Sequence, residues 1–118
     1  MGRCFVNERL AAAEAADLTT LQACEQWYSG AYLLETVPSV LYILERHAAD
    51  PEEALVRAVN DTRDNDTIAA IVGAAVGALH GAAALPERWV TQLSGRTRDS
   101  DDGEVQRTMV RARERWGD

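Results

Sequence analysis

The segment TIAAIVGAAVGALH, residues 67–80, carries apolar side chains on every side of a helix. A helix of that kind is buried all round. Gly73, Gly77 and Gly81 recur at every fourth position and therefore share one face. Because glycine inside a helix costs about 1 kcal/mol relative to alanine, we expect this face to receive another helix backbone at close range. The segment predicts the central helix of a larger helical body.

The rest of the chain also predicts helices, because no stretch alternates apolar and polar residues as a half-buried strand does. We expect helices over about 7–28 with a break near 17–20, and over 32–48, 51–60, 67–80, 86–93 and 102–116. Pro38 predicts either a kink in the second helix or a helix start near residue 37. Residues 93–106 form the one loop-rich, charge-dense stretch. The expected fold is all-α, a multi-helix body in which residues 1–118 form a single unit.

Charge and composition argue against several classes of function. The chain has 118 residues and a net charge of −7, and its 12 basic residues form no cluster, which argues against nucleic-acid backbones and anionic membranes. No apolar run approaches the roughly 20 residues of a membrane span. The N-terminus lacks the apolar core of a secretory signal, and Cys4 and Cys24 make no disulfide framework. We therefore expect a cytoplasmic protein.

The residues that carry candidate chemistry lie in DTRDNDT, positions 61–67, just before the apolar helix. Asp64 and Asp66 stand two residues apart, and Thr67 adds a hydroxyl oxygen. Clustered oxygen ligands suit a hard cation such as Mg²⁺ or Mn²⁺. The same residue types also form helix N-caps, so Asp66 capping the helix, with Asp64 favouring its dipole, is the competing interpretation. The pattern is not an EF-hand loop, which requires a glycine and a distant glutamate.

Four ordered segments carry a family resemblance. They are GAYLLETVP at 30–38, EEALVRAVN at 52–60, NDTRDNDTIAAIVGAAVGALHG at 60–81 and ALPERW at 84–89. Together they resemble the C-terminal region of the ADP-ribosylglycohydrolase family, whose members show Asp-x-Asp-[Thr/Ser] before a Gly/Ala-rich helix and then Leu-Pro-x-x-Trp. The resemblance covers about residues 30–116.

The resemblance implies an all-α hydrolase with a dinuclear Mg²⁺ or Mn²⁺ centre that cleaves ADP-ribosyl glycosidic bonds. Asp64, Asp66 and Thr67 would be metal ligands, and the substrate would be an ADP-ribosylated side chain or an ADP-ribose-like small molecule. No catalytic residue is assigned. Two metals would polarise the ribose hydroxyls and a bound water.

The sequence departs from the family pattern in two places. Family members supply further metal ligands from an N-terminal Thr/Asp/Asp cluster, and no such cluster precedes residue 60. We therefore expect a C-terminal part that is inactive alone and acts with an N-terminal partner chain or as a homo-oligomer. Thr62 and Arg63 stand where many members carry Gly-Gly, so Arg63 either binds a substrate phosphate or pairs with Asp61. The alternative function is a non-catalytic helical interaction or dimerisation module.

Overall fold

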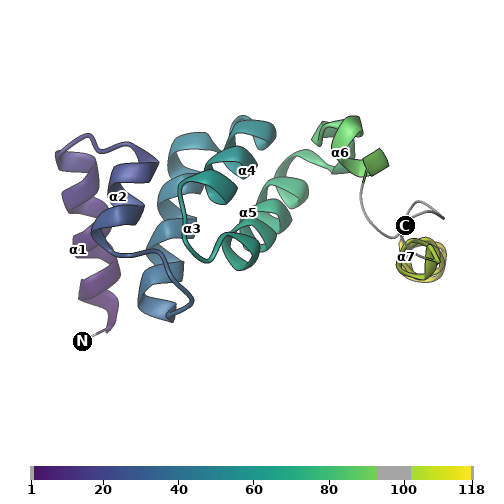
Figure 1. Ribbon diagram of the computed structural model, residues 1–118, viewed down its shortest axis with the longest axis horizontal. Helices are drawn as coiled ribbons and strands as arrows, with labels where there is room; N and C mark the ends of the chain where they lie inside the picture. The colour runs from purple at the N-terminus through teal and green to yellow at the C-terminus, as the bar shows by residue number, and fades with distance from the viewer. Residues whose placement is uncertain (1, 93–101, 118) are drawn as a thin grey trace. The chain divides into compact units, whose positions relative to one another are not determined.

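The structure is a computed structural model that describes residues 2–92 and 102–117, with side-chain surroundings from residue 5 onward. The described residues are helical and contain no strand, which confirms the all-α prediction (Figure 1). The helices are α1 (Gly2–Ala15), α2 (Thr20–Gln26), α3 (Leu33–His47), α4 (Pro51–Asn60), α5 (Asn65–His80), the short 3₁₀ helix η1 (Ala82–Ala84), α6 (Glu87–Gln92) and α7 (Glu104–Trp116).

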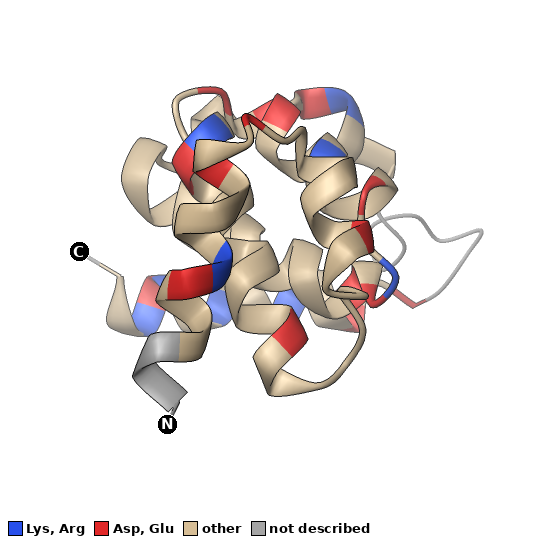
Figure 2. Cartoon of the chain, turned by 90° about the vertical axis from the view of Figure 1, so that its left-hand side faces the viewer, with Lys and Arg blue, Asp and Glu red and all other residues tan. Residues whose placement is uncertain are grey.

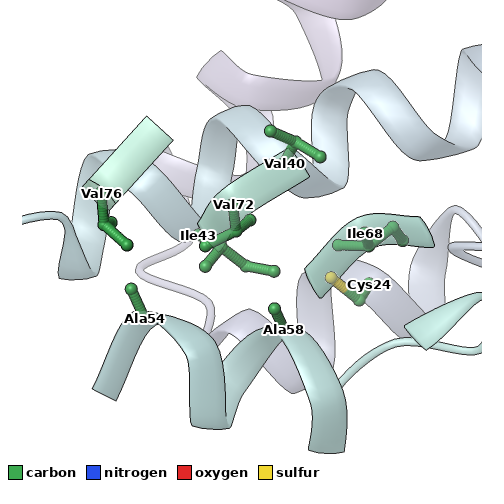
Figure 3. Packing of buried hydrophobic residues seen from close by; sticks show 8 residues of the cluster. All are labelled: Cys24, Val40, Ile43, Ala54, Ala58, Ile68, Val72 and Val76. Carbon is green, nitrogen blue, oxygen red and sulfur yellow. The ribbon is translucent and has the colours of Figure 1, made fainter. Parts of the chain in front are cut away.

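The chain divides into two compact units, Met1–Ala84 and Leu85–Asp118. In the first unit α3, α4 and α5 pack against one another, and α1 and α2 pack on α3 (Figure 1). One cluster of buried side chains joins α5 to α3, α4 and α2: Cys24, Val40, Ile43, Ala54, Ala58, Ile68, Val72 and Val76 (Figure 3). A second cluster joins α1, α2 and α3 around Trp27 and Tyr42. The prediction that residues 1–118 form one unit stays a prediction.

The helix boundaries follow local signals. The predicted break near residues 17–20 is confirmed, since α1 ends at Ala15 and α2 starts at Thr20. Thr19 and Gln22 form a reciprocal capping box at the start of α2. The Asp50 side chain accepts a hydrogen bond from the Glu53 amide at the start of α4. These bonds satisfy amides that a helix start otherwise leaves unpaired.

Helix α3 runs without interruption through Pro38. The predicted helix start near residue 37 is therefore wrong, because the first turn begins four residues earlier, at Leu33. Pro38 itself is fully buried. Burial of its ring in the core offsets part of the cost of a missing backbone donor inside a helix.

Helix α5 is buried on one side only in this structure, which corrects the prediction of burial all round. Ile68, Val72 and Val76, spaced by four, are 0–1% exposed, and in Figure 3 they gather with side chains of α3 and α4. Ile71 and Leu79 on other faces are 44% and 66% exposed. The neighbouring helices of the first unit therefore bury one stripe of α5, leave Ala69, Gly73, Ala75 and Gly77 half-buried, and leave apolar side chains such as Ile71 and Leu79 exposed.

The glycine face of α5 also differs from expectation. A Cβ at Gly73 would lie 3.2 Å from the Leu55 side chain, and a Cβ at Gly77 would meet nothing within 4 Å. Gly81 lies just past the helix and has φ +83°, a conformation that suits glycine. Within the described chain, no helix backbone approaches these glycines as predicted.

In the second unit, α6 and α7 match the predicted segments to within two residues at each described boundary. Val105, Met109 and Trp116 of α7 are 64–75% exposed, so their apolar stripe is not buried in the described chain. Most of the loop predicted at 93–106 lies outside the described residues. No helix in the part of the chain that the structure describes is long and apolar enough to cross a membrane. Acidic and basic residues are scattered over the helices (Figure 2).

Candidate functional site

The candidate residues lie in the short connection between α4 and α5. One of its three carboxylates is buried, and the other two are at least partly exposed. Asp61 and Thr62 are buried, Asp64 is half-buried, and Asp66 is exposed. Helix α5 begins at Asn65, two residues earlier than predicted. Asp66 and Thr67 therefore belong to the first helical turn, and Asp64 immediately precedes it.

Asp61 has a structural role. Its Oδ2 accepts a hydrogen bond from the Thr20 hydroxyl at the start of α2, and its Oδ1 lies 3.4 Å from Nη1 of Arg57. Nε of Arg57 also lies 2.9 Å from Glu53, an ion pair by distance without hydrogen-bond geometry. Both oxygens of the Asp61 carboxylate are thus occupied by protein groups, and the predicted alternative of an Arg63–Asp61 pair is wrong.

Ser29 binds the backbone of the connection between α4 and α5. Its backbone carbonyl accepts hydrogen bonds from the amides of Arg63 at 3.3 Å and Asp64 at 3.1 Å. Its side-chain Oγ accepts a further bond from the Arg63 amide at 3.2 Å. The Thr62 hydroxyl in turn donates to the Ala58 carbonyl of α4 at 2.6 Å. The backbone before Asp64 is therefore fixed by bonds to residues far away in the sequence.

A second set of bonds fixes the segment that contains Ser29. The Glu35 carboxylate accepts from the Gly30 amide at 3.1 Å, and the Thr36 hydroxyl donates to the Gly30 carbonyl at 3.0 Å. From the sequence alone, Gly30, Glu35 and Thr36 were recognisable only as part of a family resemblance. Their contacts show why a glycine followed five residues later by Glu-Thr matters here: the first turn of α3 binds the residue next to Ser29.

The predicted ligands themselves remain available. The side chains of Asp64, Asp66 and Thr67 make no hydrogen bond to any residue that the structure describes. Asp64 is the N-cap of α5, yet its side chain caps no amide. The competing interpretation, in which Asp66 caps the helix, is wrong because Asp66 lies inside the first turn. Both carboxylates are at the positive end of the α5 dipole, which favours negative charge.

Arg63 points away from the buried carboxylate. Its guanidinium lies 4.5 Å from the centre of the Tyr28 ring, and both side chains are exposed. A guanidinium over an aromatic face keeps donors directed to the side. Arg63 directly precedes Asp64 in the sequence, so the same connection also carries a cationic side chain.

Cys24 belongs to the hydrophobic core and is fully buried. Burial raises the pKa of its thiol to about 11, a hydrogen bond with Ser39 lowers it, and the negative charge of Asp61 raises it. Such a thiol is not ionised at neutral pH and is a poor nucleophile or metal ligand. The site chemistry therefore depends on oxygen atoms.

The donor set fits part of a hard-cation site. Two carboxylates and a hydroxyl are the oxygen ligands that Mg²⁺ accepts. In the described parts of the chain, no three acidic, histidine or cysteine side chains come together as a group that could hold a metal ion. Residues 61–67 therefore carry oxygen-bearing side chains on a backbone that Ser29 anchors.

The described chain is thus helical, and an acidic connection precedes its Gly/Ala-rich helix α5. The sequence matches the ADP-ribosylglycohydrolase family over residues 3–117. The chain therefore belongs to the ADP-ribosylglycohydrolase family.

A relative from Archaeoglobus fulgidus, named as an uncharacterized protein, is 39% identical over 83 residues. That match covers 70% of this chain and 26% of the relative. The chain thus spans about a quarter of the length of the relative it matches. No solved structure matches the sequence.

Proposed function

We propose that this chain is the C-terminal part of a Mg²⁺- or Mn²⁺-dependent hydrolase that cleaves ADP-ribosyl glycosidic bonds. The observation that carries the proposal is the contrast among three nearby carboxylates. Asp61 is fully occupied by Thr20 and Arg57, whereas Asp64 and Asp66 have no described partner at the start of α5. Family membership supplies the reaction class.

In this proposal Asp64, Asp66 and Thr67 hold part of the metal centre. When bound, a pair of divalent ions would polarise the ribose hydroxyls and a water molecule. The anchored backbone at Arg63 and Asp64 holds the ligands in place before binding. The Arg63 guanidinium, stacked on Tyr28, would bind a phosphate of an ADP-ribosylated substrate or of an ADP-ribose-like molecule.

The proposed centre is incomplete within the described chain. Mg²⁺ requires near-octahedral coordination, and two carboxylates with one hydroxyl leave positions to fill. Further ligands would come from an N-terminal partner chain or from a second copy. We place this activity in the cytoplasm as part of the same proposal.

The second candidate is a helical interaction or dimerisation module, and the exposed side of α5 favours it. Ile71 and Leu79 are substantially exposed, and space is open at Gly77. If this side binds a second copy, light scattering will detect a dimer. Leu79→Ser would then weaken it, and Gly77→Ala would weaken it while stabilising the isolated helix.

Metal titration tests the first candidate. Binding of Mn²⁺ to the full chain would be measured by electron paramagnetic resonance of the free ion. We expect Asp64→Asn and Asp66→Asn each to weaken binding at least about tenfold, since each removes a charged ligand. Glu8→Gln removes the same charge from an exposed position on α1 and should leave binding unchanged.

Hydrolysis is then assayed as Mg²⁺-dependent release of ADP-ribose from ADP-ribosylated peptides. We expect little release from this chain alone and release once a chain carrying the Thr/Asp/Asp cluster is added. If Mn²⁺ binds equally to the wild-type protein and to the variant carrying both substitutions, the metal site is not at these residues. A dimer with no Mn²⁺ binding would support the interaction module instead.

A further inference from the structure

We propose that Glu35 is a positioning residue for Asp64, an inference that rests on the proposed metal-dependent function. The two residues do not touch. Glu35 acts through a chain of hydrogen bonds: its carboxylate accepts from the Gly30 amide, and the preceding residue, Ser29, accepts from the Asp64 amide. The first turn of α3 thereby determines where the backbone enters α5.

The segment between α2 and α3 requires such support because its backbone is strained. Tyr28 has φ +73° and Ser29 has φ +41°, left-handed values that non-glycine residues rarely adopt. Strained residues persist only where surrounding contacts hold them. Glu35 and Thr36 bind the amide and the carbonyl of Gly30, the next residue, and Thr36 is buried.

The space around Gly30 shows how close the Glu35 carboxylate lies to the backbone of residue 30. A Cβ at residue 30 would lie 2.8 Å from Oε2 of Glu35 and 3.2 Å from the Tyr28 ring. The carboxylate would have to shift from its present position. We therefore expect Gly30→Ala to weaken the same contact that removal of the Glu35 side chain abolishes, by an independent route.

The consequence for the site is geometric. Ser29 accepts both amides that precede α5, and its Oγ adds a third acceptor for the Arg63 amide. These bonds hold the Asp64 backbone while leaving its carboxylate without a described partner. When the segment around Ser29 loosens, the Asp64 carboxylate no longer stays in one place relative to Asp66, and a shared cation is bound less tightly.

The experiment compares Glu35→Ala with Glu35→Gln in the full chain. The glutamine side chain keeps an oxygen acceptor for the Gly30 amide, and alanine does not. Hydrogen exchange of the Arg63 and Asp64 amides is measured by NMR without metal, and Mn²⁺ binding is measured by electron paramagnetic resonance. Circular dichroism and the urea unfolding midpoint check that each variant is folded.

We expect Glu35→Ala to lower protection of both amides and to weaken Mn²⁺ binding by about fivefold or more, as the loss of one hydrogen bond implies. Glu35→Gln should restore most of both properties. Gly30→Ala should resemble Glu35→Ala, and Glu8→Gln should resemble the wild type.

Equal protection and equal Mn²⁺ affinity in Glu35→Ala and the wild type would overturn the role of Glu35 and leave the proposed metal site intact. Failure of the wild-type chain to bind Mn²⁺ would overturn the metal site and, with it, this inference. A loss of Mn²⁺ binding in Glu35→Ala that Glu35→Gln does not restore would also overturn the inference, because the carboxylate charge would then be the cause.

Discussion

The guanidinium of Arg9 donates a hydrogen bond to the carbonyl oxygen of Leu34 across 2.8 Å. In a regular helix that carbonyl would accept from the amide of residue 38, but residue 38 is proline and has no N–H. A side chain from α1 thus replaces the donor that Pro38 removes from α3. This contact explains how α3 stays continuous through a proline.

A double-mutant cycle tests this compensation. Arg9→Met removes the donor and should lower the free energy of unfolding by about 1 kcal/mol. In a Pro38→Ala background the alanine amide supplies the bond, so Arg9→Met should cost clearly less. Chemical denaturation of the four proteins gives the coupling energy. Additive effects would show that Arg9 does not serve the Leu34 carbonyl.

Alanine substitutions at two isoleucines of α5 test whether only one side of this helix is buried. Ile68 is fully buried and Ile71 is 44% exposed, although both lie in the same apolar helix. We expect Ile68→Ala to cost about 2–5 kcal/mol of stability and Ile71→Ala less than about 1 kcal/mol. Urea unfolding followed by circular dichroism measures both. Comparable losses would mean that the exposed side is covered in solution, for example in a dimer.

Two aspartates at helix N-caps should respond differently to substitution. The Asp50 side chain accepts a hydrogen bond from the Glu53 amide at 3.1 Å, and the Asp64 side chain caps nothing. Asp50→Ala should therefore cost about 1 kcal/mol, and Asp64→Ala should change stability by less than about 0.5 kcal/mol. Thermal or urea unfolding without divalent ions makes the comparison. A large loss at Asp64 would assign it a structural role.

Burial of the Cys24 thiol predicts that the free energy of unfolding depends on pH. Its pKa rises from 9.0 to about 11 on folding, chiefly through burial. Its contribution to stability is therefore fully present below pH 9 and is lost as the pH rises toward 11, because the unfolded chain releases the proton first. The slope is about 1.4 kcal/mol per pH unit in that interval.

The control for this effect is Cys24→Ala. The stability difference between the wild type and Cys24→Ala should shrink between pH 9 and pH 11, since the other ionisable groups are common to both proteins. A constant difference over this interval would show that Cys24 does not titrate as described. The folded protein should also leave Cys24 unreactive toward a thiol reagent at pH 7.5.

Helix positions were predictable because capping residues, proline and glycine act over a few neighbouring residues. Asp50, with Pro51 after it, marked the start of α4, and the helix-poor residues near Asp17 marked the break between α1 and α2. The expected helix over 32–48 matched α3, but the alternative start near residue 37 was wrong, because Arg9 of another helix compensates for Pro38. No local signal near Pro38 indicates that donor.

The acidic run 61–67 was likewise recognisable as a candidate site from its oxygen-bearing residues alone. The sequence did not indicate that Asp61 is structural while Asp64 and Asp66 stay available. That difference depends on Thr20, which binds Asp61 from 41 residues away. Local residue patterns were thus sufficient for the helices and the candidate ligands. Which carboxylates stay available, and which side of α5 stays exposed, depended on packing between distant segments, because burial and hydrogen-bond partners arise only when those segments meet.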